Sequence, residues 1–78
     1  MYVVVDLDTL KEKAYPTLQA ARYAALDVKR GEVCKVVLDT SLPSSELRCA
    51  LYNRDGYATE RTVIANIING VARKLSAQ

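Results

Sequence analysis

The chain has 78 residues, half of them apolar, which is enough for one small domain with a single modest core. Eleven Lys and Arg against nine Asp and Glu give a net charge of +2, which is too small to indicate a particular partner. The absence of His excludes imidazole bases and histidine metal ligands, and two Cys are too few for a disulfide scaffold or a four-cysteine metal site. We therefore expect residues 1–78 to form one compact domain without a metal ion or cofactor.

The N-terminal segment and the distribution of apolar residues predict where the protein is located. Residues 1–5 include a short apolar run, but no basic region precedes it and acidic residues follow at once, which is untypical of a signal peptide. No apolar stretch approaches the roughly 20 residues needed to span a bilayer. We expect a soluble cytoplasmic protein with reduced thiols and no membrane contact.

The first predicted element is a strand over Tyr2–Leu7, which is rich in β-branched residues. Two interpretations of the following residues are open. Thr9–Glu12 fits a capping box and could begin a helical turn, whereas Lys11–Tyr15 could return as a second strand. We favour the hairpin, because Pro16 would end a helix within two turns.

A helix is predicted over Leu18–Arg30, with Thr17 as its N-cap. Apolar residues recur there at helical spacing, and the many alanines favour a helix. Gly31 suits the left-handed residue that follows a helix. The expected core face consists of Leu18, Ala21, Ala25 and Val28.

The middle of the chain predicts two further strands, Val33–Leu38 and Glu46–Asn53, paired as a hairpin. The second strand alternates, with Leu47, Cys49 and Leu51 on the core face and Arg48, Ala50 and Tyr52 on the outward face. Cys34, Val36 and Leu38 would join the core from the first strand. Both cysteines are therefore expected to be buried, unreactive thiols, which one hairpin register would place directly opposite each other.

The last predicted element is a helix from about Thr59 to Leu75, with a bend near Asn69 and Gly70. Its spacing follows i, i+3, i+4, i+7 and i+11 at Ile64, Ile67, Ile68, Val71 and Leu75. The basic Arg73 and Lys74 would complement the dipole of that helix. The predicted fold class is α+β, an antiparallel sheet of three or four strands with two helices packed on one face.

One segment has the pattern of a catalytic motif. In Val3–Leu10 an apolar strand leads to Asp6 and Asp8, which resembles the first motif of haloacid-dehalogenase-type phosphatases, where two such aspartates serve as nucleophile and acid/base. The residue that this family places between the second Asp and the Thr-Leu pair is missing here, and its α/β core needs a far longer chain. We interpret both aspartates as solvent-facing residues of a strand and its turn. With no glycine-rich phosphate loop, we expect a protein that is not an enzyme.

The candidate binding surface combines arginine and tyrosine on the outward face of the strand predicted over Glu46–Asn53 and its neighbours. Arg and Tyr are enriched in the hot spots of protein interfaces, and the same pair suits single-stranded nucleic acid. An ordinary solvated strand face would have the same alternation. The predicted partner-binding residues are Lys35, Arg48, Tyr52, Arg54, Tyr57 and Arg61.

The first functional hypothesis is a small non-catalytic module that occupies a surface of a larger protein or protein complex. In size and general pattern the chain resembles the accessory proteins of phages and mobile elements, among them the anti-CRISPR inhibitors of a host defence system. The alternative is a module that binds single-stranded nucleic acid through the Arg/Tyr face. A second alternative is a structural subunit that assembles with itself through a sheet edge, so both a monomer and a homodimer are considered.

Overall fold

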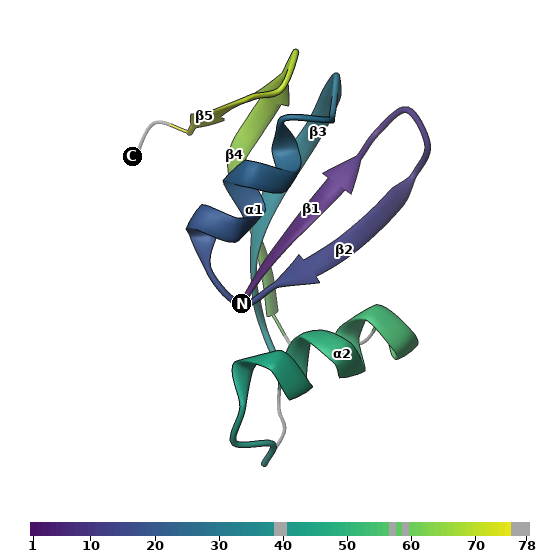
Figure 1. Ribbon diagram of the computed structural model, residues 1–78, viewed down its shortest axis with the longest axis vertical. Coiled ribbons are helices and arrows are strands. Elements are labelled where there is room, and N and C mark those ends of the chain that lie inside the picture. The colour runs from purple at the N-terminus through teal and green to yellow at the C-terminus, as the bar shows by residue number, and fades with distance from the viewer. Residues whose placement is uncertain (39–40, 57, 59, 76–78) are drawn as a thin grey trace.

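The computed structural model describes residues 1–38, 41–56, 58 and 60–75, and these ranges contain five strands and two helices. The strands form one antiparallel sheet in the order β2-β1-β3-β4-β5 (Figure 1). This confirms the α+β class, with five strands in place of the three or four expected. In chain order the elements are β1 (Tyr2–Asp6), β2 (Lys11–Tyr15), α1 (Leu18–Ala25), β3 (Arg30–Val37), α2 (Ser45–Asp55), β4 (Glu60–Ile68) and β5 (Val71–Lys74).

The hairpin predicted at the N-terminus is confirmed, and Asp6 builds its turn. The Asp6 Oδ1 atom accepts hydrogen bonds from the N–H groups of Asp8 at 2.9 Å and Thr9 at 3.3 Å. Leu10 then adopts a positive φ of 61°, and its N–H donates to the Asp6 carbonyl at 2.8 Å. A carboxylate that accepts from the following main-chain N–H groups stabilises a turn. Asp6 therefore has a structural role, and the alternative of a helix starting at Thr9 is wrong.

Helix α1 begins where it was predicted but ends earlier. The Thr17 side chain accepts a hydrogen bond from the Ala20 N–H at 3.1 Å, as expected of an N-cap. The helix ends at Ala25 and not at Arg30, because Arg30 already belongs to β3. Gly31 is therefore not the residue that ends the helix. A Cβ atom at Gly31 would lie 2.1 Å from the carbonyl oxygen of Val5, so only glycine fits between the paired strands β1 and β3.

The strand predicted over Glu46–Asn53 is wrong, because these residues lie in helix α2. The Ser44 side chain caps the helix by accepting from the Glu46 N–H at 3.2 Å, and Gly56 ends it in the left-handed region with a φ of 68°. Cys49 and Tyr52, three residues apart, are the buried residues of α2. The predicted hairpin with Val33–Leu38 therefore does not form, so the two cysteines are not cross-strand neighbours. Both are nevertheless buried and free, as predicted.

The helix predicted over Thr59–Leu75 is also wrong, because Glu60–Lys74 forms the hairpin β4–β5; Thr59 lies outside the described residues. Asn69 and Gly70 form its two-residue turn with φ angles of 51° and 81°, the positive values that a tight hairpin requires. The turn is held against the α1–β3 connection, since the Asn69 N–H donates to the Lys29 carbonyl at 2.6 Å and the Gly70 N–H to the Val28 carbonyl at 2.8 Å. The bend expected at Asn69 and Gly70 is thus a complete reversal of the chain.

The core lies on both faces of the sheet. Val3, Val4 and Val5 are all buried, and successive side chains of a strand point to opposite faces, so β1 needs cover on both sides. Helix α1 contributes Ala21 and Ala25 to the cluster around Val4, which also holds Val28, Val33, Ala65 and Ile67. Helix α2 contributes Cys49 and Tyr52 to the cluster of Val3 and Val5, which also holds Ala14, Cys34 and Val36. The two helices therefore pack on opposite faces of the sheet, and not on one face as expected.

Figure 1 shows α1 in front of the sheet and α2 across its lower end. Each helix leaves part of the sheet uncovered. Among the described residues, neither helix has the length and apolar character needed to cross a membrane.

Candidate functional site

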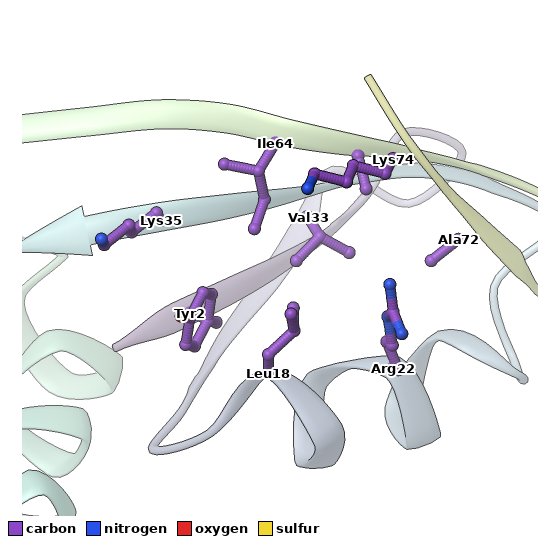
Figure 2. Close-up of a pocket in the computed structure, with 9 residues that line it drawn as sticks. Tyr2, Leu18, Arg22, Val33, Lys35, Ile64, Ala72 and Lys74 are labelled. Atoms are coloured by element: carbon purple, nitrogen blue, oxygen red, sulfur yellow. The ribbon is translucent and has the colours of Figure 1, made fainter. Parts of the chain in front are cut away.

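A groove of about 390 Å³ lies between α1, β5 and the part of the sheet that α1 leaves uncovered (Figure 2). In Figure 2, Leu18 and Arg22 of α1 point toward Val33 and Ile64 of the sheet, and Lys74 reaches in from β5. The groove thus has a helix wall, a strand wall and a sheet floor. Its lining consists of Tyr2, Leu18, Arg22, Val33, Lys35, Ile64, Ala65, Ala72 and Lys74.

An irregularity in β4 makes the floor apolar. The β3–β4 register passes from Val33 opposite Ala65 to Cys34 opposite Val63, which leaves Ile64 without a cross-strand partner. A β-bulge of this kind places two successive side chains on the same face of the sheet. Ile64 and Ala65 accordingly both line the groove. With strict alternation, Ile64 and Ala65 would point to opposite faces of the sheet. The bulge therefore adds Ile64 to the face on which Ala65 already lies.

Three cations surround this floor. Arg22, Lys35 and Lys74 are exposed, and none of the lining residues is acidic. Within the described part of the chain, the recorded ion pairs use Arg30, Arg54 and Arg61 and leave these three cations unpaired. Like charges around a low-dielectric surface raise the local positive potential. The groove therefore suits a ligand that joins an anionic group to an apolar one.

The Arg/Tyr surface predicted from the sequence is not formed as one face. Arg48 and Arg54 project from α2, where the Arg48 Nε donates to the Leu42 carbonyl at 2.9 Å and Arg54 forms an ion pair with Asp55 at 2.9 Å. The hydrogen bond between Arg54 and Asp55 raises the pKa of the guanidinium and lowers the pKa of the carboxyl. Tyr57 lies outside the described residues.

The remaining predicted residues are divided between two sites. Lys35 lines the groove and also a small hollow of about 160 Å³ that it shares with Arg48. Tyr52 and Arg61 come together on the other face of the sheet. Tyr52 and Arg61 are thus in contact, but Tyr52 belongs to helix α2 and Arg61 to strand β4. They do not share the predicted outward face of one strand.

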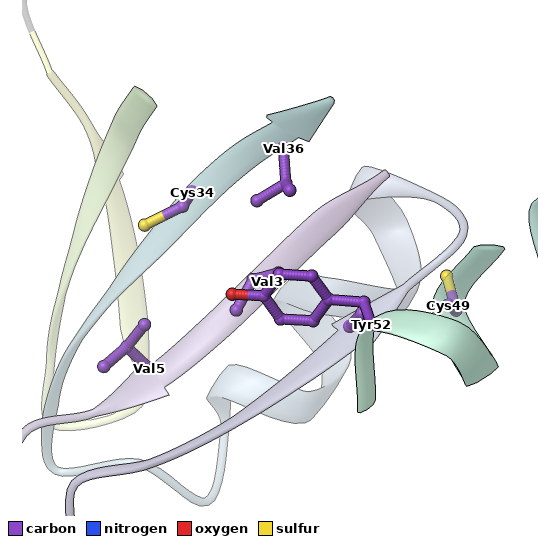
Figure 3. Packing of buried hydrophobic residues seen from close by; sticks show 7 residues of the cluster. Val3, Val5, Cys34, Val36, Cys49 and Tyr52 are labelled. Atoms are coloured by element: carbon purple, nitrogen blue, oxygen red, sulfur yellow. The ribbon is translucent and has the colours of Figure 1, made fainter. Parts of the chain in front are cut away.

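Tyr52 is a core residue of α2 that packs against the sheet (Figure 3). Its ring lies over Val3 and is 3% exposed. Its hydroxyl donates to the Glu12 Oε1 atom at 2.5 Å and accepts from the Arg61 Nη1 atom at 3.2 Å. Arg61 also forms an ion pair with Glu12 at 3.2 Å. Because β1 and β3 lie between β2 and β4, this Glu12–Tyr52–Arg61 network spans four strands.

We expect the Tyr52 hydroxyl to ionise far above the ordinary tyrosine range. Burial, and then its hydrogen bond to Glu12, raises the pKa of Tyr52 to about 12. A tyrosine in the unfolded chain ionises near 10, so the stability from this shift is complete below pH 10 and is lost as the pH rises toward 12. That loss should amount to as much as about 3 kcal/mol. Absorbance at the tyrosinate band during an alkaline titration measures the pKa of Tyr52. A tyrosine component that still ionises near pH 12 in Tyr52→Phe would contradict its assignment to Tyr52.

The thiol of Cys49 lies in the same core cluster as Tyr52. Burial raises the pKa of this thiol, which disfavours the reactive thiolate. This agrees with the expectation of an unreactive cysteine.

Comparison of the chain with known protein families, with characterised proteins and with solved structures found no significant match. The functional argument therefore depends on the geometry and the charges of the molecule itself.

Proposed function

We propose that the protein is a non-catalytic binding module that occupies a surface of a larger protein, with the groove between α1 and β5 as its contact site. The observation that carries this proposal is the apolar floor bordered by Arg22, Lys35 and Lys74 without an acidic residue in the lining. Protein interfaces commonly combine a desolvated apolar centre with a polar rim. The lining also lacks carboxylates and thiols, so it offers none of the usual nucleophiles and general bases apart from its basic side chains and the hydroxyl of Tyr2.

The more specific form of this proposal is an inhibitor of a host system, encoded by a phage or a mobile element and acting in the cytoplasm. The small size of the domain supports it, because blocking a partner requires only a surface that fits. The resemblance in size and general pattern to anti-CRISPR proteins points the same way.

Reversing two groove charges should abolish partner capture. We expect immobilised protein with Arg22→Glu and Lys35→Glu to lose at least one host protein that the unmodified domain retains, because rim charges accelerate and orient association. The matched control is Lys11→Glu with Arg73→Glu, which makes the same charge change at exposed residues outside the groove lining. Quantitative mass spectrometry of the retained proteins, followed by titration calorimetry with the retained partner, measures the effect. If both double variants captured the partner equally well, the groove would not be the contact site.

Single-stranded nucleic acid is the second candidate ligand, because Tyr2 stands beside the same three cations. Aromatic stacking combined with Lys and Arg is how many proteins bind single strands. The small net charge and the aliphatic floor favour a protein partner. Fluorescence anisotropy with labelled oligonucleotides at about 50 and 200 mM salt separates the two, since binding to phosphates falls steeply with salt.

A further inference from the structure

The two edge strands of the sheet, β2 and β5, differ in whether a side chain forms hydrogen bonds with their outward main-chain groups. At the β2 edge, the side-chain amide of Asn53 forms hydrogen bonds with the main chain of Ala14. The Ala14 N–H donates to the Asn53 Oδ1 atom at 2.7 Å, and the Asn53 Nδ2 atom donates to the Ala14 carbonyl at 3.5 Å. Asn53 therefore takes the place that another strand would take, which protects this edge from strand addition.

Among the described residues, none covers the β5 edge in this way. Val71 pairs with Ile68 across the turn, and the Leu75 N–H donates to the Ile64 carbonyl at 3.0 Å, so the main chain of every second residue from Val71 faces β4. The main-chain groups of Ala72 and Lys74 then face away from β4. In the described part of the chain, no hydrogen bond is recorded from these outward groups.

The residues with the open main chain also line the groove. The side chains of Ala72 and Lys74 form its strand wall, and Arg22 stands on the helix wall opposite. We propose that an extended acidic segment of the partner adds to β5 as a sixth strand, placing an apolar side chain in the groove and carboxylates beside Arg22 and Lys74. This inference rests on the proposed function and defines its ligand. Strand addition supplies main-chain hydrogen bonds, and the alternate side chains supply specificity.

A second copy of this chain is a poorer occupant of the same edge. β5 carries Arg73 and Lys74 next to each other, so pairing two β5 strands would bring like charges together. Like charges on facing strands are destabilising, whereas an acidic strand is complementary. The charges of the edge thus select an acidic partner segment.

The test is a titration of the isotope-labelled protein with a synthetic Val-Glu peptide of about eight residues, in which Val and Glu take turns along one strand face and Ser and Thr occupy the other face. We expect the amide resonances of Ala72 and Lys74 to shift and to become protected from hydrogen exchange. Lys74→Glu should weaken binding about tenfold, because it places a repulsive charge beside the peptide carboxylates. Arg73→Glu is the matched control, since its side chain points to the other face of β5 and should change the affinity less than about twofold.

Two further peptides separate strand addition from simple charge attraction. A Val-Lys peptide of the same length should not bind, and N-methylation of alternate peptide bonds in the Val-Glu peptide should weaken binding by about tenfold or more. Unchanged affinity after N-methylation, or resonance shifts confined to residues outside β5 and the groove, would overturn the inference, while the groove variants still test the proposed function. No binding of the Val-Glu peptide at about millimolar concentration would overturn it as well.

Discussion

Tyr52→Ala should lower the free energy of unfolding by about 3–5 kcal/mol, a large share of the roughly 4–12 kcal/mol expected for a chain of this length. The substitution removes a buried ring from between α2 and β1 and leaves a cavity beside Val3. It also removes one of the two buried side chains of α2. Urea denaturation followed by circular dichroism measures the loss, and a decrease below about 1 kcal/mol would contradict the packing of α2 on this face.

Two controls divide this effect into its parts. Tyr52→Phe keeps the ring and removes the hydroxyl, so it should cost about 1–1.5 kcal/mol, because Glu12 and Arg61 can still pair with each other. Leu47→Ala changes the same helix at a side chain that is 50% exposed and should cost less than about 1 kcal/mol. If Leu47→Ala proved as costly as Tyr52→Ala, the orientation of α2 would be wrong.

The C-terminal half shows why a helical spacing misled the prediction. Ile64, Ile67 and Ile68 fit a helix face, but the bulge at Ile64 breaks the period-2 pattern that would have identified the strand. Only Ile67 of these three is fully buried, and Ile68 is 57% exposed. The decisive local signal was the Asn69-Gly70 pair flanked by β-branched residues, which is typical of a tight hairpin. Turn chemistry was therefore more informative here than periodicity.

Helix α2 illustrates the opposite error. The alternation of Leu47, Cys49 and Leu51 is typical of a strand, yet Leu47 is exposed and Cys49 shares its buried face with Tyr52. Caps at both ends of the segment, Ser44 and Gly56, were available as helix signals. By contrast, the N-terminal hairpin and the start of α1 were predictable from neighbouring residues. Pro16 prevents a helix from continuing through residues 9–15, and Thr17 is the N-cap of α1.

The candidate site could be predicted only in fragments. Lys35 was identified, but Tyr2, Arg22 and Lys74 come from three separate elements and meet only after the sheet has formed. No spacing along the chain connects them. The same holds for Glu12, which lies 40 residues from Tyr52 and completes its hydrogen-bond network. Neighbouring residues in the sequence specify turns and caps, whereas the groove depends on the order of the strands.

Gly31→Ala should lower the free energy of unfolding by about 3 kcal/mol or more, because the new methyl group has no space between the central strands. Its Cβ would lie 2.1 Å from the Val5 carbonyl oxygen and 2.9 Å from a methyl carbon of Val28. The first of these contacts is with main chain, so β1 and β3 must separate to relieve it. Urea denaturation measures the loss, and the dispersion of amide resonances shows whether the variant still folds.

Gly56→Ala separates this steric effect from the ordinary cost of replacing a glycine. Gly56 has a φ of 68°, and a Cβ there meets no atom within 4 Å, so the substitution should cost only about 1 kcal/mol. That smaller loss is also what Gly31→Ala would give if Gly31 merely ended a helix, as its sequence context suggests. A loss at Gly31 well above the loss at Gly56 therefore identifies the close approach of β1 and β3 as the cause. Equal losses would show that the main chain at Gly31 has room for a side chain.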